Sequence, residues 1–291
     1  GIGPTYTDKV ARRGIRVYDL VNNTYKERVR LNVKLVNRIL QHVLQVDHRL
    51  DVKEILKQCS RWGVDLQSYV GNVSEIINRA LEEKQNVLFE GAQATFLDID
   101  HGTYPFVTSS NPIAGGACVG AGVGPTRIDK VLGVCKAYTT RVGEGPFPTE
   151  LDDDVGFHLR DIGREFGTVT GRPRRCGWLD LNMIRYARMV NGLTSLALTK
   201  LDVLNGLERL MICVGYRWRG SNITSLSIHD MESCEPIYVE LEGWETIFNG
   251  DEICSEAKAY IAKIEEETGL PIDYISTGPK RVDTICRRSV W

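Results

Sequence analysis

The residues Ser195-Leu-Ala-Leu-Thr-Lys200 combine a short apolar run with a polar end. A run of this length, bounded by polar residues, is typical of a buried strand. Residues 131–138 and 271–276 have the same character. Amphipathic segments separate such runs, and the clearest of them, residues 251–269, ends in a glycine as helices often do. Strands that alternate with helices predict an α/β or α+β fold with a large mixed sheet.

The opening part of the chain is predicted to be mainly helical. Residues 26–46 place apolar side chains at three- and four-residue steps, which is the pattern of an amphipathic helix. Residues 52–62 and 73–84 are further candidate helices, and the second follows Asn72 with Glu75 three residues on, as in a capping box. Three more apolar runs predict strands: residues 86–91, 207–218 and 237–241.

The composition is that of a globular protein without a global charge bias. Of the 291 residues, 42% are hydrophobic and 25% are charged, and the net charge is -2. These values disfavour a disordered or collagen-like chain and give no general attraction to nucleic acid or to an anionic membrane. No apolar run reaches the ~20 residues that a membrane-spanning helix needs. Any anion site must therefore be local.

Eight cysteines are spread along the chain without a CxxC pair. This spacing disfavours a zinc knuckle or a redox pair. Several of the cysteines, such as Cys135, lie inside apolar runs. We therefore expect reduced, mostly buried thiols, which are typical of a cytoplasmic protein.

Three loops that follow predicted strands are candidate ligand sites, because sheets of this kind bind ligands at the carboxyl ends of their strands. The first, residues 89–111, is rich in polar groups and leads to five glycines within residues 115–124. Such glycines let backbone amides approach a ligand, and a turn-rich surface connection is the alternative. Asp98, Asp100 and His101 could suggest a metal site, but no diagnostic ligand spacing accompanies them, which favours a hydrogen-bonded structural role.

The second loop, residues 167–178, places Arg172, Arg174 and Arg175 within four residues. Guanidinium groups bind carboxylate and phosphate oxygens in bidentate geometry, so the loop indicates an anionic small molecule. A solvated basic loop or a contact with RNA would use the same residues, and the loop alone leaves these alternatives open.

The third loop follows the strand predicted at residues 195–200. Its Thr-Lys-Leu-Asp sequence resembles the guanine-reading turn of GTP-binding proteins. In such a turn Lys200 would lie along the base, and the carboxylate of Asp202 would accept hydrogen bonds from the guanine ring NH and amino group. Adenine offers no donor at these positions, so the carboxylate would stay unpaired and reject it.

Taken in order along the chain, these segments resemble adenylosuccinate synthetases over nearly all 291 residues. The match rests on several long motifs in the same order rather than on one short string. They are Gly1-Ile-Gly-Pro-Thr-Tyr-Thr-Asp-Lys-Val-Ala-Arg-Arg-Gly14, residues 89–111, Lys136-Ala-Tyr-Thr-Thr-Arg-Val-Gly143, Gly145-Pro-Phe-Pro-Thr-Glu150, residues 171–180, residues 199–204 and Ser276-Thr-Gly-Pro279.

The resemblance implies a GTP-dependent ligase of AMP biosynthesis, with the mixed sheet of that family and a helical subdomain. GTP, IMP and L-aspartate would give adenylosuccinate, GDP and phosphate, with Mg²⁺ as the metal ion. The γ-phosphoryl group would move to the 6-oxygen of IMP, and the aspartate amine would then displace phosphate. The implied parts are the helical subdomain at 1–70, the remaining nucleotide-binding sheet at 71–135, and a C-terminal α+β region at 136–291 with the aspartate loop and the guanine pocket.

The resemblance also implies roles for individual residues. Gln93 matches a glutamine near the reacting edge of the hypoxanthine ring, and Thr108 matches a contact with the IMP phosphate. Arg12 matches an arginine that reaches the IMP phosphate of the neighbouring subunit, which implies a homodimer. The other matches, grouped by ligand, are Arg172 for the IMP ribose; Val142, Val169, Thr170, Arg172 and Arg174 for aspartate; and Arg174, Lys200, Asp202, Ser276 and Gly278 for GTP.

The sequence departs from the family pattern at two positions of the arginine-rich loop. Val169 stands where a threonine is expected, which removes a hydroxyl donor from the aspartate site. Pro173 replaces a basic residue between Arg172 and Arg174 and restricts the backbone there. We expect Pro173 to change loop closure more than chemistry.

The family's glycine-rich phosphate loop has no counterpart here, since no Gly-Lys pair occurs in the sequence. In the family that segment carries an aspartate that acts as base and binds Mg²⁺, and a histidine that acts as general acid follows it. None of His42, His48, His101, His158 and His229 has that context. We therefore expect the chain to lack the N-terminal strands, the base, the acid and the Mg²⁺ ligands, and to be inactive alone.

Two other functions remain open from the sequence. A non-catalytic paralogue could bind IMP or GTP as a sensor or as a dimer partner. Nucleic-acid binding through residues 172–175 is the second, although the near-neutral net charge and the lack of interleaved aromatic residues disfavour it.

Overall fold

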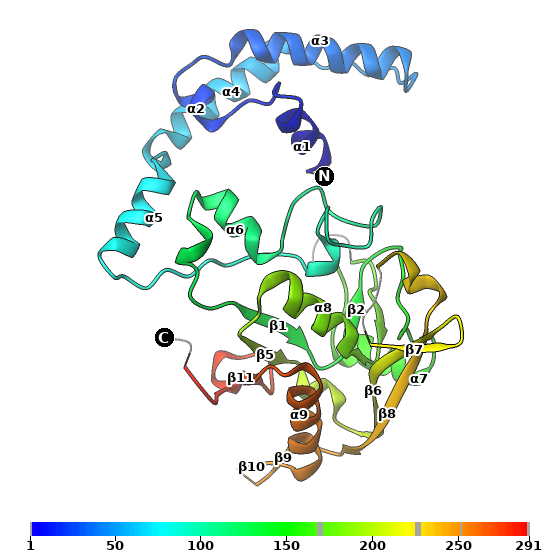
Figure 1. Cartoon of the computed structure of the whole chain (residues 1–291). Helices are drawn as coiled ribbons and strands as arrows, with labels where there is room; N and C mark the ends of the chain where they lie inside the picture. The colour runs from blue at the N-terminus through cyan, green and yellow to red at the C-terminus, as the bar shows by residue number, and fades with distance from the viewer. Residues whose placement is uncertain (1, 168–170, 225–227, 251, 290–291) are drawn as a thin grey trace. The chain divides into compact units, whose positions relative to one another are not determined.

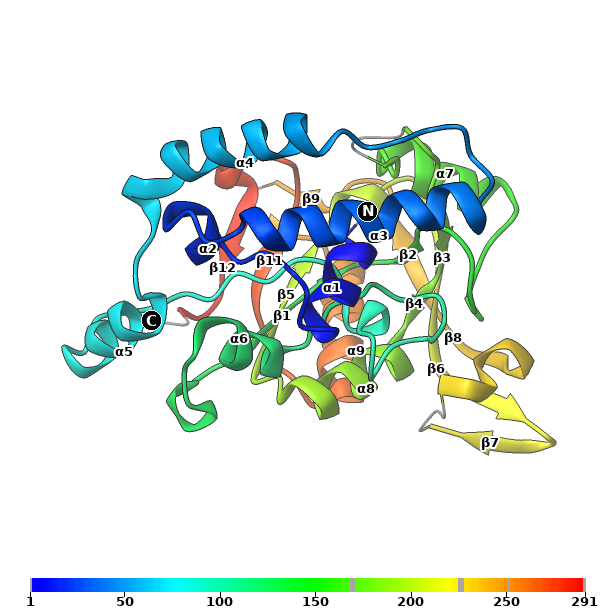
Figure 2. The same ribbon diagram turned by 90° about the horizontal axis from the view of Figure 1, so that it is seen from above.

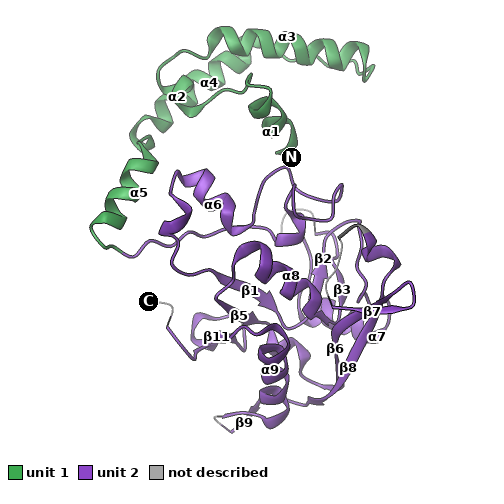
Figure 3. Cartoon of the chain, viewed as in Figure 1, with its two compact units in different colours: residues 1–85 green, residues 86–291 purple. Residues whose placement is uncertain are grey.

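The computed structural model describes residues 2–167, 171–224, 228–250 and 252–289. The predicted contacts Val169 and Thr170 lie outside these described residues. The chain divides into two compact units, Gly1–Gln85 and Asn86–Trp291 (Figure 3). The family-based division at residues 70 and 135 stays a prediction.

The described elements of the first unit are helices, as expected from the sequence (Figure 1). Its small core joins Tyr25, Val29 and Val33 to Cys59. The amphipathic pattern of residues 26–46 forms a helix that ends somewhat earlier, at His42. The α-helices of this unit are α1 (Gly3–Val10), α2 (Val17–Val21), α3 (Lys26–His42), α4 (Val52–Leu66) and α5 (Val73–Glu82). Asn72 caps α5 as predicted, since its Oδ1 accepts a hydrogen bond from the Glu75 amide at 3.4 Å.

The second unit contains the sheet that the opening motif predicts (Figure 2). Its strand order is β1-β5-β11-β12. The first three strands are parallel, and β12 is antiparallel to β11. The strands are β1 (Leu132–Lys136), β5 (Ser195–Thr199), β11 (Ile272–Ser276) and β12 (Thr284–Cys286). This mixed sheet confirms the predicted fold class.

A second sheet and two short ribbons complete the strands of this unit. The second sheet consists of β4 (Leu179–Asp180), β6 (Leu207–Trp218), β7 (Ser221–Ile223) and β8 (Glu235–Trp244), with β6 paired to the other three. The ribbons are β2 (Thr139–Arg141) with β3 (Arg175–Gly177), and β9 (Phe248–Asn249) with β10 (Glu252–Ile253).

One hydrophobic core lies under both sheets of the second unit. It includes Leu196 and Leu198 from β5 and Leu210 from β6, all at most 1% exposed. Helices α8 (Leu181–Asn191) and α9 (Ser255–Thr268) pack against each other and supply further core residues, among them Leu181 and Tyr260. The remaining α-helices of this unit are α6 (Ala114–Ala121) and α7 (Asp154–Ile162).

Two expectations about the first candidate loop were wrong. Residues 86–91 form no strand, and Leu88 is 72% exposed, so the apolar run is not buried in a sheet. Most of the glycine-rich stretch forms helix α6 rather than a loop. At Gly116 a Cβ would lie 2.0 Å from the Asn111 carbonyl oxygen, so close packing explains that glycine.

The state of the cysteines and the character of the described helices agree with what the sequence predicts. All eight cysteines are free thiols, and five of them are buried: Cys59, Cys176, Cys213, Cys234 and Cys254. Within the described ranges, no helix is both long and apolar enough to cross a membrane.

Candidate functional site

The carboxyl ends of β1, β5 and β11 bring several predicted contacts to one edge of the sheet. Because the three strands are parallel, Lys136, Lys200 and Ser276 all lie where their strands end. Lys200 has a left-handed backbone (φ 60) and begins a short 3₁₀ turn, Leu201–Leu204, that contains Asp202. This edge is the usual ligand position in such sheets.

The residues that the sequence predicts for the guanine pocket form a small polar group on this edge. Asp202 is partly buried, and burial raises the pKa of its carboxyl, with the negative charge of Asp283 adding to the rise. Ser276 Oγ donates to the Gly278 carbonyl at 2.9 Å. A Cβ at Gly278 would lie 2.5 Å from the Asp283 carboxylate, so the turn accommodates glycine best. The structure thus brings the predicted residues of β5 and β11 to neighbouring positions.

A buried carboxylate that the sequence analysis missed organises the cations at this edge. Glu165 is fully buried. Its Oε1 accepts hydrogen bonds from Lys136 Nζ (2.7 Å), the Tyr138 hydroxyl (2.7 Å) and Lys200 Nζ (3.0 Å). Its Oε2 accepts from Arg174 Nη1 at 2.8 Å. Burial alone would raise the pKa of Glu165, but the hydrogen bonds and the charge of Lys136 outweigh it and lower the pKa to about 2.

The described residues that flank positions 168–170 of the arginine-rich loop pair with each other as the two arms of a hairpin, which we call the arginine-rich hairpin. Phe166 and Pro173 form an antiparallel bridge, and the Arg174 amide donates to the Glu165 carbonyl at 2.9 Å. Arg172 is exposed beyond the bridge, and Arg174 points its guanidinium to Glu165. Val142 is exposed and follows β2, whose register pairs Arg141 with Arg175 and so puts Val142 beside the loop's end.

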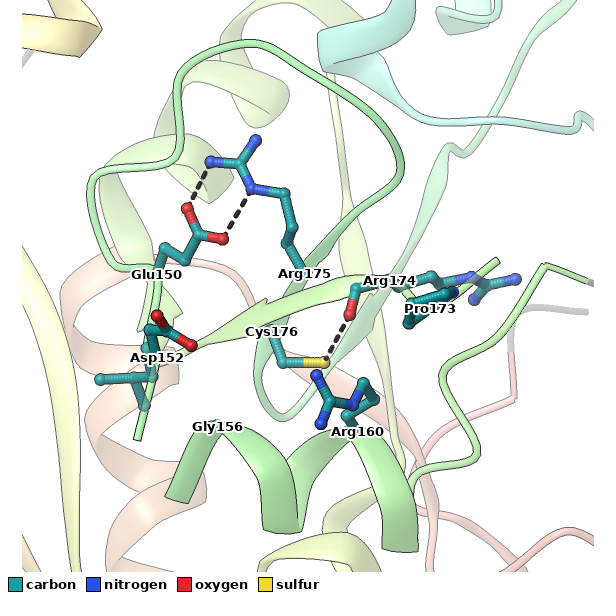
Figure 4. A pocket seen from close by; sticks show the side chains of 9 residues that line it. Glu150, Asp152, Gly156, Arg160, Pro173, Arg174, Arg175 and Cys176 are labelled. Carbon is teal, nitrogen blue, oxygen red and sulfur yellow. Dashed lines mark hydrogen bonds and ion pairs between the residues drawn. The ribbon is translucent and has the colours of Figure 1, made fainter. Parts of the chain in front are cut away.

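The third arginine of the loop is committed to a carboxylate. Arg175 Nε donates to Glu150 Oε1 at 2.7 Å, and Nη2 contacts the other carboxylate oxygen. This pair lines a cavity of about 520 Å³ next to α7, which Figure 4 shows from close by. The remaining lining residues are Leu151, Asp152, Gly156, Arg160, Pro173, Arg174 and Cys176. Among the described residues to which the family resemblance assigns a ligand, Arg174 alone lines this cavity.

Gln93 and Thr108 are also brought together. Gln93 Nε2 donates to Thr108 Oγ1 at 3.2 Å, and Ser110 Oγ donates to Gln93 Oε1 at 3.3 Å. Gln93 is exposed and has a positive φ of 72, a conformation that non-glycine residues rarely adopt outside constrained sites. The two residues therefore form one polar group within residues 92–113, which we call the 92–113 loop and which contain most of the first candidate loop.

Buried polar side chains hold the 92–113 loop in shape. Asp98 is 0% exposed, and its Oδ1 accepts from the amides of Asp100 (2.9 Å) and His101 (3.1 Å). This use of the carboxylate agrees with the structural role favoured for Asp98. Arg141 Nη2 donates to Thr103 Oγ1 at 2.8 Å and ties the loop to β2.

Helix α8 holds the same loop from another side. The Tyr186 hydroxyl donates to the His101 carbonyl at 2.9 Å. Asn191 accepts from the Ala114 amide at 2.9 Å and donates to Thr95 Oγ1 at 3.0 Å. Positions on this helix gave no functional signal in the sequence, because their polar groups serve contacts far along the chain.

Arg12 belongs to the first unit. It follows α1 with a positive φ of 59, and its amide donates to the Lys9 carbonyl at 3.0 Å. The side chain is exposed. Its predicted role at a neighbouring subunit stays a prediction.

Comparisons with known proteins agree with the motif order. The family model for adenylosuccinate synthetase matches residues 1–285. The chain is 50% identical to the adenylosuccinate synthetase of Syntrophomonas wolfei, over 98% of this chain and 68% of that protein. It is 51% identical to that of Moorella thermoacetica, over 99% and 69%. A solved structure of the fully ligated enzyme from Plasmodium falciparum matches with a TM-score of 0.89 and 38% identity, over 99% and 69% of the two chains.

Proposed function

The chain belongs to the adenylosuccinate synthetase family of GTP-dependent ligases, and we propose how its own residues serve that reaction. The family joins IMP and L-aspartate to form adenylosuccinate on the route to AMP. We assign GTP to the carboxyl edge of β1, β5 and β11, and IMP to the 92–113 loop. The observation that carries the proposal is that these two polar groups assemble separately, each from residues that match the family's motifs.

On the guanine side, Asp202 reads the base. Its carboxylate accepts from the guanine ring NH and amino group, while Lys200 lies along the ring. Ser276 and Gly278 complete the pocket from β11, the strand next to β5. Arg174 supplies positive charge toward the nucleotide.

On the substrate side, Gln93 holds the reacting edge of the hypoxanthine ring and Thr108 binds the IMP phosphate. Their hydrogen bond to each other presets this geometry. Arg172 contacts the IMP ribose. Aspartate is held by the arginine-rich hairpin and the residue after β2: Val142, Val169, Thr170, Arg172 and Arg174.

The chemistry needs charge neutralisation and positioning more than covalent help from the protein. The γ-phosphoryl group of GTP passes to the 6-oxygen of IMP. The aspartate amine then attacks C6 of the hypoxanthine ring and displaces phosphate. Arginine side chains offset the charge that moves with the phosphoryl group. Mg²⁺ accompanies the nucleotide phosphates, and we assign none of the described acidic residues to it, because no group of three or more metal-ligating side chains occurs among them.

We extend the proposal to a homodimer in the cytoplasm, with Arg12 reaching the IMP phosphate of the neighbouring subunit. Helix α3 turns one apolar face toward its own core and leaves another apolar face exposed. On the exposed face, Leu31 is 59% exposed, and Leu35 and Ile39 follow at four-residue steps. A second copy of the chain would cover such a stripe. Eight free thiols fit a reducing compartment.

Substitution of Asp202 by Asn tests the guanine assignment directly. GDP binding, measured by isothermal titration calorimetry, should weaken by roughly 10- to 150-fold, because a hydrogen bond to a charged group contributes about 1.5–3 kcal/mol. IMP binding should stay within about twofold of wild type, because the 92–113 loop is built separately.

Xanthosine diphosphate sharpens this experiment. Its 2-oxo group can accept from the new asparagine amide, so Asp202→Asn should bind it more tightly than wild type does. An equal loss of affinity for GDP, IMP and xanthosine diphosphate would contradict base reading by Asp202.

A further inference from the structure

Glu165 lies between the arginine-rich hairpin and the carboxyl edge of β1, β5 and β11, which we call the nucleotide edge. It is not itself one of the proposed ligand contacts. It follows helix α7 after a tight turn in which Arg164 has a positive φ of 50. The Glu165 amide donates to the Arg160 carbonyl at 2.8 Å, which fixes its backbone. With 0% exposure, its carboxylate cannot be reached by a substrate and can act only through the side chains around it.

Lys200 is held at both ends. Its backbone is fixed by the left-handed turn after β5, and its Nζ donates to the Gly163 carbonyl and to Glu165 Oε1. The ammonium group is therefore already occupied by acceptors from the α7 turn. What Lys200 can offer a base is its four-carbon stem, because long cationic side chains bury their stems while the charged end stays solvated or paired.

The other oxygen of the same carboxylate holds the hairpin. Glu165 Oε2 accepts from Arg174 Nη1, while Oε1 accepts from Lys136 and Lys200. One negative charge thus serves three cations. Each cation would repel the others if the carboxylate were absent, since like charges that are partly buried are screened less than exposed ones.

We propose that Glu165 is a positioning residue for guanine nucleotide binding: its buried carboxylate anchors the Lys200 ammonium so that the Lys200 stem forms a fixed platform for the base, and it holds Arg174 beside that platform. This inference rests on the proposed guanine pocket. It assigns base recognition to Asp202 and base support to Lys200, with Glu165 acting through Lys200.

The proposal predicts a distinct pattern of losses. A stem contact does not distinguish one purine from another, so Glu165→Gln should weaken GDP and inosine diphosphate by the same factor. Asp202→Asn should affect GDP more, because inosine diphosphate lacks the 2-amino group that Asp202 accepts from. We expect about tenfold weaker GDP binding for Glu165→Gln, since an amide cannot replace the charge or accept at both positions.

A double-mutant cycle separates positioning from general damage. GDP and inosine diphosphate affinities are measured by calorimetry for wild type, Glu165→Gln, Lys200→Met and the double variant. If Glu165 acts through Lys200, adding Glu165→Gln to Lys200→Met should cost less than threefold. Glu267→Gln is the matched control, because Glu267 also pairs with two cations, Arg185 and Lys263, away from this edge.

Each outcome decides the matter. Multiplicative losses in the cycle, or a Glu165→Gln protein that binds GDP like wild type, would overturn the positioning role while leaving the guanine pocket in place. A wild-type protein that does not bind GDP would overturn the pocket and this inference together. If Glu165→Gln fails to fold, Glu165→Asp, which keeps the charge on a shorter stem, enters the same cycle with the same expected non-additivity.

Discussion

The nucleotide edge and the 92–113 loop both present proposed ligand contacts, yet they are fixed by different means. At the edge, Lys200 directly follows β5 and Ser276 is the last residue of β11, so the backbone ladders of these parallel strands place them. In the loop, Gln93 and Thr108 lie outside any strand or helix, and buried polar side chains such as Asp98 hold the chain between them.

This difference indicates where each site is vulnerable. The backbone of Lys200 is placed by the many hydrogen bonds of the strand ladder, so no single one of them is critical. Its side chain, in contrast, depends on the single carboxylate of Glu165. The loop depends on a few side chains that satisfy several backbone groups at once. Because an unsatisfied buried donor costs more than an ordinary hydrogen bond contributes, the loop should respond most strongly to one substitution.

Asp98→Ala should have the largest effect. It removes a fully buried carboxylate that accepts hydrogen bonds from the Asp100 and His101 amides, so we expect a loss of roughly 3–5 kcal/mol in unfolding free energy. IMP affinity should fall more than 100-fold, whereas any protein that stays folded should bind GDP normally. Calorimetry with both ligands and a thermal melt measure these effects.

The control for this substitution is Asp98→Asn. Its amide oxygen can still accept from the two backbone amides, so it should retain much of the stability. If Asp98→Ala weakens GDP and IMP binding equally, the two regions are not independently built and the comparison fails.

The same contrast explains what the sequence could predict. Residues 195–199 form a strand, and Lys200 and Asp202, which follow it, lie at its carboxyl end as expected. A local run of apolar residues predicts such positions because a buried strand needs apolar side chains. The run at 86–91 has the same local character but forms no strand, since pairing with a neighbour is a tertiary property that a local pattern does not contain.

Glu165 illustrates the part that local patterns cannot reach. Its cationic partners Lys136, at the end of β1, and Lys200, just after β5, are 29 and 35 residues away in the chain. A single glutamate before a basic loop normally indicates a solvated surface. The only available signal was the excess of positive charge in the segments around the sheet edge, which requires a buried counter-charge once they meet.

Glu165 should make the stability contribution of the nucleotide edge depend on pH. Its folded-state pKa of about 2 lies below the ordinary value of 4.5, so its contribution is complete above about pH 5 and is lost as the pH falls toward 2. At pH 6, Glu165→Gln should be about 3 kcal/mol less stable than wild type, because it removes the buried counter-charge of three partly buried cations. The difference should shrink progressively in denaturant titrations at lower pH.

An exposed ion pair supplies the control for this titration. Glu240 pairs with Arg209 at 2.8 Å on the surface, and Glu240→Gln should change stability little at any pH. A constant gap between wild type and Glu165→Gln from pH 6 to pH 3 would show that the variant loses packing rather than charge.

The smallest effect is expected at Gly278, where the edge is closed by a turn. A new Cβ would lie 2.5 Å from Asp283 Oδ2, the oxygen that accepts from the Lys280 amide at 2.7 Å. The carboxylate must shift and weaken that hydrogen bond, so Gly278→Ala should cost about 1 kcal/mol and weaken GDP binding about three- to fivefold. Gly115→Ala is the matched control in helix α6, where a Cβ meets nothing within 4 Å and helix propensity favours alanine. If both substitutions leave GDP affinity unchanged, the β11 turn does not border the nucleotide, and the guanine pocket is formed by the β5 side alone.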